Sequence, residues 1–152
     1  MLARITGYAD YASGVADVDF VIESVAENLD IKKSVWAEVE HAAPKDAILS
    51  TNTSGLSPTA LQSVLKKPER FVVAHFWNPA QLMPLVEVVP GEKTDPKVVD
   101  ITFDLMAKIG KKPAKIKKES LGFVGNRLQL AVLREAFHIS SRASRTRPPW
   151  TT

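Results

Sequence analysis

The chain has 152 residues, of which 45% are hydrophobic, and it contains no cysteine. This length fits about one domain with a core of its own. The lack of cysteine excludes a disulfide framework, thiolate catalysis and thiolate metal sites. No apolar run reaches the roughly 18 residues that a membrane span needs, and residues 1–6 lack the apolar core of a secretory signal. We therefore expect a cytoplasmic protein without a membrane partner.

The formal net charge of +3 at pH 7 is concentrated near the end of the chain. After Phe137 the basic residues Arg142, Arg145 and Arg147 have no acidic neighbour. Removing these three from the 20 basic residues leaves 17, which equals the 17 acidic residues, so we expect no nucleic-acid partner. The lysine cluster within residues 108–118 has two interpretations: a solvated rim, or an electrostatic site for a polyanionic ligand such as a nucleotide or coenzyme A.

In the first half of the chain, apolar runs alternate with helical periods. Residues 1–16 carry no strong pattern. Beyond Asn28, apolar residues recur at Ile31, Val35 and Val39, a spacing typical of one helix face, and Pro44 ends this segment. The patterns predict strands at 17–23, 46–50 and 71–75, with helices at 28–44 and 58–65 between them.

The second half continues the alternation. The patterns predict a strand at 84–89, a helix at 94–110, a short edge strand at 112–116 and a last helix that begins within 121–126 and ends near 138. Pro96 at the start and Gly110 at the end fit the usual asymmetry of helix termini. Residues 139–152 lack periodicity, and we predict a disordered tail. Strands alternating with helices predict an α/β fold, with a largely parallel sheet covered by helices.

His75 and Glu87 are the first candidates for chemistry. His75 ends the apolar run 71–75, just before Asn78 and Pro79, so we expect its imidazole at the carboxyl end of a strand, where open α/β sheets bind ligands. Glu87 is a carboxylate inside a second apolar run. Together they suggest a general base and the group that orients it. The alternatives are a histidine bonded to a backbone carbonyl and an outward-facing glutamate.

Polar residues also gather where other strands end. Asn52, Thr53 and Ser54 follow the strand 46–50, and Glu27 and Lys32 follow the strand 17–23. These groups fit either turn and cap chemistry or donors to a polar ligand at one edge of the sheet. Asn126 and Arg127 open the last helix, where Asn126 suits a cap or a site residue. Three scattered histidines and no cysteine give no metal-ligand spacing, so no metal site is expected.

Five motifs, taken in order and spacing, resemble the 3-hydroxyacyl-CoA dehydrogenase family, most closely its 3-hydroxybutyryl-CoA-type members. The similarity extends over about residues 4–138. The motifs are Val21-Ile22-Glu23 with Glu27-Asn28-Leu29 and Lys32; Ser50-Thr51-Asn52-Thr53-Ser54; His75-Phe76-Trp77-Asn78-Pro79; Leu85-Val86-Glu87-Val88-Val89; and Gly122-Phe123-Val124-Gly125-Asn126-Arg127-Leu128. The third motif has Trp77 where phenylalanine is commoner in the family.

The resemblance implies an oxidoreductase that converts a 3-hydroxyacyl-CoA to a 3-ketoacyl-CoA with NAD, as in fatty acid β-oxidation. It implies the following site residues: His75 as catalytic base, Glu87 as the carboxylate that orients it, Ser54 and Asn126 beside the substrate, and Glu27, Lys32, Ser54 and Asn78 as cofactor contacts. It also implies an acyl-CoA substrate and a homodimer in the full-length form. A non-catalytic, crystallin-like protein on the same fold is the alternative.

The chain departs from the family pattern in three places. It contains no Gly-x-Gly-x-x-Gly turn, the usual pyrophosphate cradle, so we expect weak NAD binding by this polypeptide alone. Leu121 stands where the family usually has proline. The similarity ends near Phe137, early in the family's helical domain. We therefore expect a truncated member: residues 1–118 as a partial Rossmann-like NAD-binding domain, 119–138 as the start of the helical dimerisation domain, and 139–152 as the tail.

Overall fold

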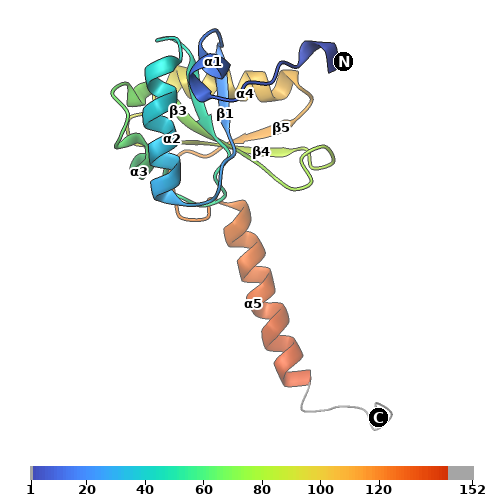
Figure 1. The fold of residues 1–152 in the computed structure, drawn as a ribbon. Helices are drawn as coiled ribbons and strands as arrows, with labels where there is room; N and C mark the ends of the chain where they lie inside the picture. The colour runs from blue at the N-terminus through green and yellow to red at the C-terminus, as the bar shows by residue number, and fades with distance from the viewer. Residues whose placement is uncertain (1, 144–152) are drawn as a thin grey trace.

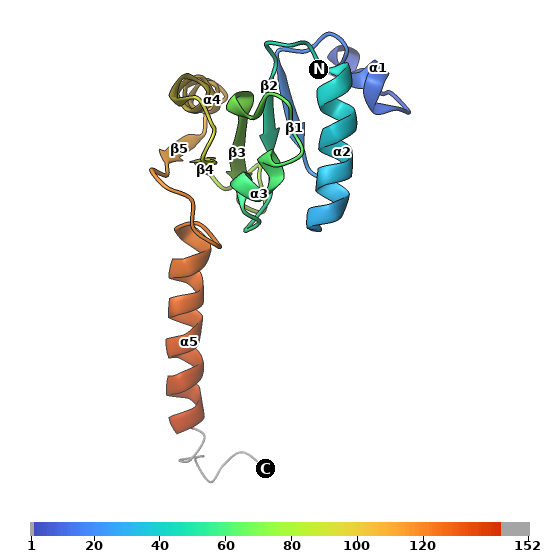
Figure 2. The same ribbon diagram turned by 90° about the vertical axis from the view of Figure 1, so that its left-hand side faces the viewer.

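The protein forms a five-stranded sheet with helices on both faces (Figures 1 and 2). The computed structural model describes residues 2–143. Its elements are η1 Leu2–Arg4, α1 Tyr11–Val15, β1 Phe20–Glu23, α2 Leu29–Ala42, β2 Ile48–Thr51, α3 Pro58–Gln62, η2 Pro68–Arg70, β3 Phe71–Phe76, β4 Leu85–Pro90, α4 Pro96–Lys108, β5 Lys112–Lys115 and α5 Gly125–Ala143. The predicted α/β class is confirmed, and the short helices η1 and α1 lie where the sequence showed no pattern.

The strands lie in the order β1-β2-β3-β4-β5, with one change of direction. The pairs β1–β2, β2–β3 and β4–β5 are parallel, whereas β3 and β4 are antiparallel. Only residues 77–84 connect β3 to β4, and a parallel connection needs a crossover of a dozen or more residues. The sheet is therefore mixed. Its edge strand β5 contains Pro113, as expected for that position.

The helices begin at the side-chain caps that the sequence suggests. The Asn28 carboxamide oxygen accepts the Asp30 and Ile31 backbone N–H groups and so caps α2. Ser57 and Asp95 cap α3 and α4 in the same way, and each precedes a proline. These caps satisfy backbone donors that a helix leaves unpaired, and they fix the points at which the chain leaves the sheet.

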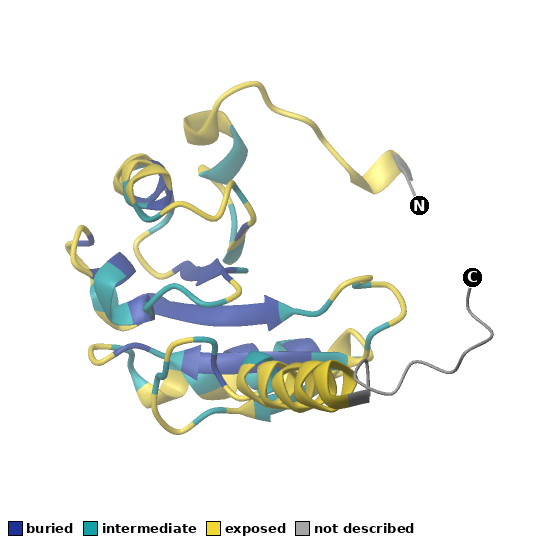
Figure 3. Ribbon diagram, turned by 90° about the horizontal axis from the view of Figure 1, so that it is seen from below, coloured by how far each residue is buried: buried dark blue, intermediate teal, exposed yellow. Residues whose placement is uncertain are grey.

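Alternate residues of the strands supply two apolar layers. On one face Leu49 and Phe71 pack against α2, where the Trp36 and Phe71 rings meet edge to face with centroids 5.1 Å apart. On the other face Val72 and Val88 pack against Met106 of α4. The central strands β2, β3 and β4 are accordingly mostly buried, whereas most residues of the outer strands β1 and β5 are half-buried or exposed (Figure 3). His75 and Glu87 belong to strands of this rigid, covered centre of the sheet.

The last helix, α5, projects away from the sheet (Figures 1 and 2), and its large apolar residues are exposed. It runs to Ala143 and not to residue 138, so the prediction of a disordered tail is wrong for residues 139–143. No glycine or proline interrupts residues 126–143, so local backbone hydrogen bonding can continue the helix to Ala143. Residues 144–152 lie outside the described part of the chain. Within residues 2–143, no helix combines the length and apolar character that a membrane crossing requires.

Candidate active site

The antiparallel pairing of β3 and β4 places His75 directly opposite Glu87. The His75 Nδ1 atom lies 3.0 Å from the Glu87 Oε2 atom. Both residues are buried, with 4% of His75 and 2% of Glu87 exposed. The histidine partner is therefore a carboxylate and not a backbone carbonyl, and the glutamate faces inward.

Four donors converge on the Glu87 carboxylate. Its Oε1 atom accepts the Val124 and Gly125 backbone N–H groups at 3.1 and 2.9 Å, and its Oε2 atom accepts the Trp77 indole N–H at 3.3 Å as well as bonding to His75. Burial acts to raise the pKa of Glu87, but the hydrogen bonds from Gly125, His75, Val124 and Trp77 outweigh it and lower the pKa. The carboxylate is thus held ionised beside the imidazole.

Aromatic rings enclose the imidazole on two sides. The centroid of the His75 ring lies 5.5 Å from that of Trp77 and 5.7 Å from that of Phe123, both in tilted arrangements. Phe123 is fully buried and has a positive φ of 50°. Among residues 2–143, none bonds to the second ring nitrogen, Nε2. A neutral imidazole whose Nδ1–H is held by a carboxylate presents Nε2 as a proton acceptor.

A second polar group lies at the ends of β1 and β2. The Glu27 Oε1 atom accepts the Thr53 hydroxyl at 2.6 Å and the Ser54 backbone N–H at 2.8 Å. Burial acts to raise the pKa of Glu27, but the bonds from Thr53 and Ser54 and the nearby Lys32 ammonium lower it. The Glu27 side chain is 44% exposed, and the Ser54 hydroxyl bonds to no other described residue. Both groups are therefore accessible to a ligand.

Lys32 was predicted to contact the cofactor, but its ammonium group is buried and bonds to other groups of the protein. Its side chain is 1% exposed, and the Nζ atom lies 2.7 Å from Glu23 Oε1, 3.2 Å from the Val25 carbonyl and 3.5 Å from Glu27 Oε2. Glu23 is in turn held by the Thr51 hydroxyl at 2.6 Å. The ammonium thus supports Glu27 from inside.

No role was predicted for Glu23 from the sequence. The available signal is a carboxylate that ends an apolar strand nine residues before a lysine. A buried charge of this kind requires a partner of opposite sign.

Asn126 connects the start of α5 to the loop that follows β2. Its Nδ2 atom donates to the Ser54 carbonyl at 2.6 Å, so two of the predicted substrate-side residues are neighbours. Asn52 was considered with Ser54, and its side-chain oxygen accepts the Phe76 backbone N–H at 2.8 Å, which ties β2 to the end of β3. Asn78 is exposed, precedes a cis peptide bond to Pro79, and shows no side-chain hydrogen bond to the other described residues.

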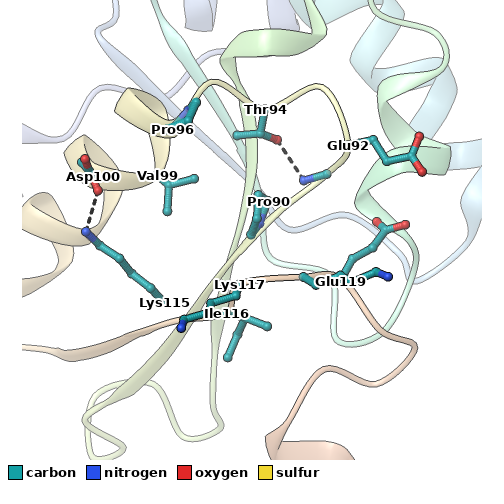
Figure 4. Close-up of a pocket in the computed structure, with 12 residues that line it drawn as sticks. Pro90, Glu92, Thr94, Pro96, Val99, Asp100, Lys115, Ile116, Lys117 and Glu119 are labelled. Atoms are coloured by element: carbon teal, nitrogen blue, oxygen red, sulfur yellow. Dashed lines mark hydrogen bonds and ion pairs between the residues drawn. The ribbon is translucent and has the colours of Figure 1, made fainter.

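A separate cavity lies away from the His75 and Glu87 pair. It has a volume of about 590 Å³ and lies at the carboxyl ends of β4 and β5, beside the start of α4 (Figure 4). Its lining includes Lys115, paired with Asp100, together with Lys117, Glu92 and Glu119. Charges of both signs line it. None of the predicted site residues contributes to it, so this cavity is separate from the His75 site.

The residues present fit one end of an NAD site. The Ser54 hydroxyl and the partly exposed Glu27 carboxylate lie at the carboxyl ends of β1 and β2, the edge at which such sheets bind dinucleotides. His75 lies near the same edge on β3. No Gly-x-Gly-x-x-Gly turn occurs in the 152 residues to hold a pyrophosphate. The fit therefore concerns the reacting end of the cofactor.

Comparisons with known proteins identify the family of the chain. Residues 1–120 match the family described as 3-hydroxyacyl-CoA dehydrogenase, NAD binding domain. The L-carnitine dehydrogenase of Mesorhizobium japonicum is 47% identical over 134 residues, a stretch that covers 88% of this chain and 37% of that protein. The chain thus spans well under half the length of this curated relative.

Solved structures show the same arrangement of elements. The (S)-3-hydroxybutyryl-CoA dehydrogenase of Ralstonia eutropha superposes with a TM-score of 0.88 at 34% identity, covering 97% of this chain and 51% of that one. An NAD+-dependent dismutase, 5-formyl-3-hydroxy-2-methylpyridine 4-carboxylic acid 5-dehydrogenase, gives a TM-score of 0.85 at 40% identity, covering 89% of this chain and 44% of that one. The chain belongs to the 3-hydroxyacyl-CoA dehydrogenase family, and its residues 1–120 match the NAD-binding domain of that family.

Proposed function

We propose that the chain carries the acid–base pair of an NAD-dependent dehydrogenase that oxidises a 3-hydroxyl group to a ketone. The observation that supports this proposal best is the 3.0 Å contact between His75 Nδ1 and Glu87 Oε2, with Nε2 left without a described partner. In the oxidation, Nε2 takes the hydroxyl proton, and the Glu87 carboxylate stabilises the charged imidazolium that results. NAD bound beside Ser54 and Glu27 would supply the acceptor for the hydride that leaves the carbon of that hydroxyl group.

The neighbouring residues receive roles that follow from their positions. We assign the free Ser54 hydroxyl and the Asn126 carboxamide to the substrate oxygen, since the two residues are joined by a hydrogen bond beside the pair. Glu27 and Ser54 are assigned to the cofactor side. Lys32 acts there through Glu27, because its ammonium is buried. Asn78 is assigned to the cofactor by family resemblance alone.

Two substrate classes fit this chemistry. A 3-hydroxyacyl-CoA, as in fatty acid β-oxidation, is supported by the family and by the similarity to the Ralstonia eutropha enzyme. L-carnitine is supported by the higher identity of 47% to the Mesorhizobium japonicum protein and 41% to the Bacillus cereus one, both L-carnitine dehydrogenases. Both compounds carry a secondary alcohol at the third carbon, so the same base serves either. We retain the acyl-CoA as the first candidate and L-carnitine as the second.

Steady-state assays test the function and separate these substrates. The purified chain is assayed with acetoacetyl-CoA and NADH, and separately with L-carnitine and NAD. Replacing His75→Ala removes the general base and should lower kcat by roughly 10²–10⁴-fold with the true substrate. Activity that is unaffected by His75→Ala would contradict the mechanism. Activity with either substrate that is lost in His75→Ala would argue against the non-catalytic, crystallin-like alternative.

A further inference from the structure

Trp77 touches both members of the acid–base pair. Its indole Nε1 atom donates to Glu87 Oε2, the same oxygen that His75 Nδ1 contacts. Its ring also lies against the imidazole, with the two planes inclined at 50°. A phenylalanine in this place would keep the ring contact and lose the donor. The hydrogen bond from Trp77 Nε1 can therefore be tested separately from the packing of the Trp77 ring.

Gly125, the first residue of α5, provides the space for this ring. A Cβ atom at position 125 would lie 2.2 Å from Trp77 Cζ2 and 3.0 Å from Cη2, too close for either atom to stay in place. Among the described glycines the positive φ angles belong to Gly110 and Gly122, so the backbone conformation does not require glycine at 125. Close approach of the indole is the physical reason for glycine there.

We propose that Trp77 is a positioning residue of the His75–Glu87 pair, because its indole N–H fixes Glu87 Oε2 opposite the imidazole while Gly125 admits its ring. The catalytic meaning of this inference rests on the proposed function. The contact itself can be tested without any activity.

The arrangement of donors explains why the indole matters. Glu87 Oε1 is held by two backbone N–H groups at the start of α5, whereas within residues 2–143 Oε2 bonds only to His75 and Trp77. Without the indole donor, the imidazole alone would have to orient Oε2 and share its negative charge. A carboxylate with fewer donors is easier to protonate, so the loss of Trp77 Nε1–H raises the pKa of Glu87.

The first test is Trp77→Phe in the full chain. The Glu87 carboxyl group is titrated by carbon-13 NMR, and the His75 ring nitrogens are followed by nitrogen-15 NMR. We expect the pKa of Glu87 to move upward from its lowered position and the Nδ1–H signal to broaden as the ring loses a single orientation.

The matched control is Trp36→Phe. The Trp36 ring is fully buried, and its Nε1 atom has no hydrogen-bond partner among the described residues. This change should reduce the stability of the fold and leave the titration of Glu87 as it was. An unchanged Glu87 titration in Trp77→Phe would overturn the inference, and so would an equal shift in both variants.

The second test uses the close contact with Gly125. Gly125→Ala should push the indole away from Glu87 and raise the pKa of that carboxyl in the same direction as Trp77→Phe. In a Trp77→Ala background the added methyl group has no ring to displace, so Gly125→Ala should then have little further effect. Additive shifts in the double variant would show that Gly125 acts independently of Trp77 and would contradict the second half of the inference.

Measurements of kcat test whether Trp77 has a positioning role in catalysis. If the unmodified chain is active, Trp77→Phe should lower kcat by up to about tenfold, the value of one hydrogen bond, with little change in KM. Because NADH is expected to bind this chain weakly, an inactive unmodified chain would leave the NMR titration to decide whether Trp77 orients Glu87. A kcat that is unchanged by Trp77→Phe in an active chain would remove the positioning role.

Discussion

At the scale of single residues, Lys32 and Glu23 form a buried ion pair at the carboxyl end of β1, beside the partly exposed Glu27. Lys32 is shared by two carboxylates, at 2.7 Å from Glu23 and 3.5 Å from Glu27. A buried ion pair adds little over an apolar pair of the same shape, but leaving one partner alone is strongly unfavourable. The cluster therefore holds Glu27, and through it Ser54, in a fixed position.

Replacing Lys32→Met isolates the Glu23 carboxylate in the interior. We expect the free energy of unfolding to fall by about 3–5 kcal/mol, measured by urea denaturation. The double variant Glu23→Gln, Lys32→Met should recover a large part of this loss. The exposed pair Lys115–Asp100 is the matched control, since Asp100→Asn should change stability by no more than about 1 kcal/mol. Equal losses of stability in Lys32→Met and Asp100→Asn would contradict the conclusion that burial makes the Glu23–Lys32 pair sensitive to the loss of one partner.

At the scale of elements, a side chain of β4 caps a helix that begins far away in sequence. Glu87 accepts the Val124 and Gly125 N–H groups at the start of α5. An ionised carboxylate is favoured there, because the amino end of a helix carries partial positive charge. The orientation of α5 is in this way linked to the ionisation of Glu87.

The contact between Glu87 and the start of α5 predicts that the free energy of unfolding falls at low pH. The pKa of Glu87 is lowered below its ordinary value of 4.5 in the folded chain, and that of Glu27 is lowered as well. Their stabilising contribution is therefore complete above pH 4.5 and is lost as the pH falls through the folded-state values. Urea denaturation at a series of pH values should show this loss, and Glu87→Gln should reduce it. A profile that stays flat below pH 4.5 would exclude the linkage.

At the scale of the whole molecule, no Gly-x-Gly-x-x-Gly turn that could hold the pyrophosphate of NAD occurs in the 152 residues. We expect NADH to bind weakly or not at all to this chain alone. Titration of NADH fluorescence with the purified chain measures this directly, with His75→Ala as a variant that should leave the result unchanged. Micromolar affinity would contradict the expectation.

The exposed apolar side chains of α5 are also a feature of the whole molecule. Leu128, Leu130 and Phe137 are more than half exposed on a helix that extends away from the sheet. The relatives that match this chain are roughly twice as long or longer. The homodimer and the helical dimerisation domain therefore remain proposals for the longer form.

Much of the fold follows from local sequence signals. The caps Asn28, Ser57 and Asp95 and the alternating apolar runs predict the helices and strands to within a few residues. The prediction fails at residues 139–143, because a helix can continue through residues that have no packing partner. The site is predictable in part, since His75 at a strand end and Glu87 in an apolar run are visible as unusual polar residues.

The sequence by itself determined the α/β class, the family and the two residues of the candidate acid–base pair. Only the tertiary structure decided that β4 runs antiparallel to β3, which places His75 opposite Glu87, that Lys32 turns inward to Glu23, and that Trp77 and Gly125 meet beside the pair. The physical reason is the distance along the chain over which each kind of interaction acts. Periodicity and caps act within one or two turns of chain. Strand register and tertiary hydrogen bonds join residues as far apart as Ser54 and Asn126, which are 72 positions apart, through packing.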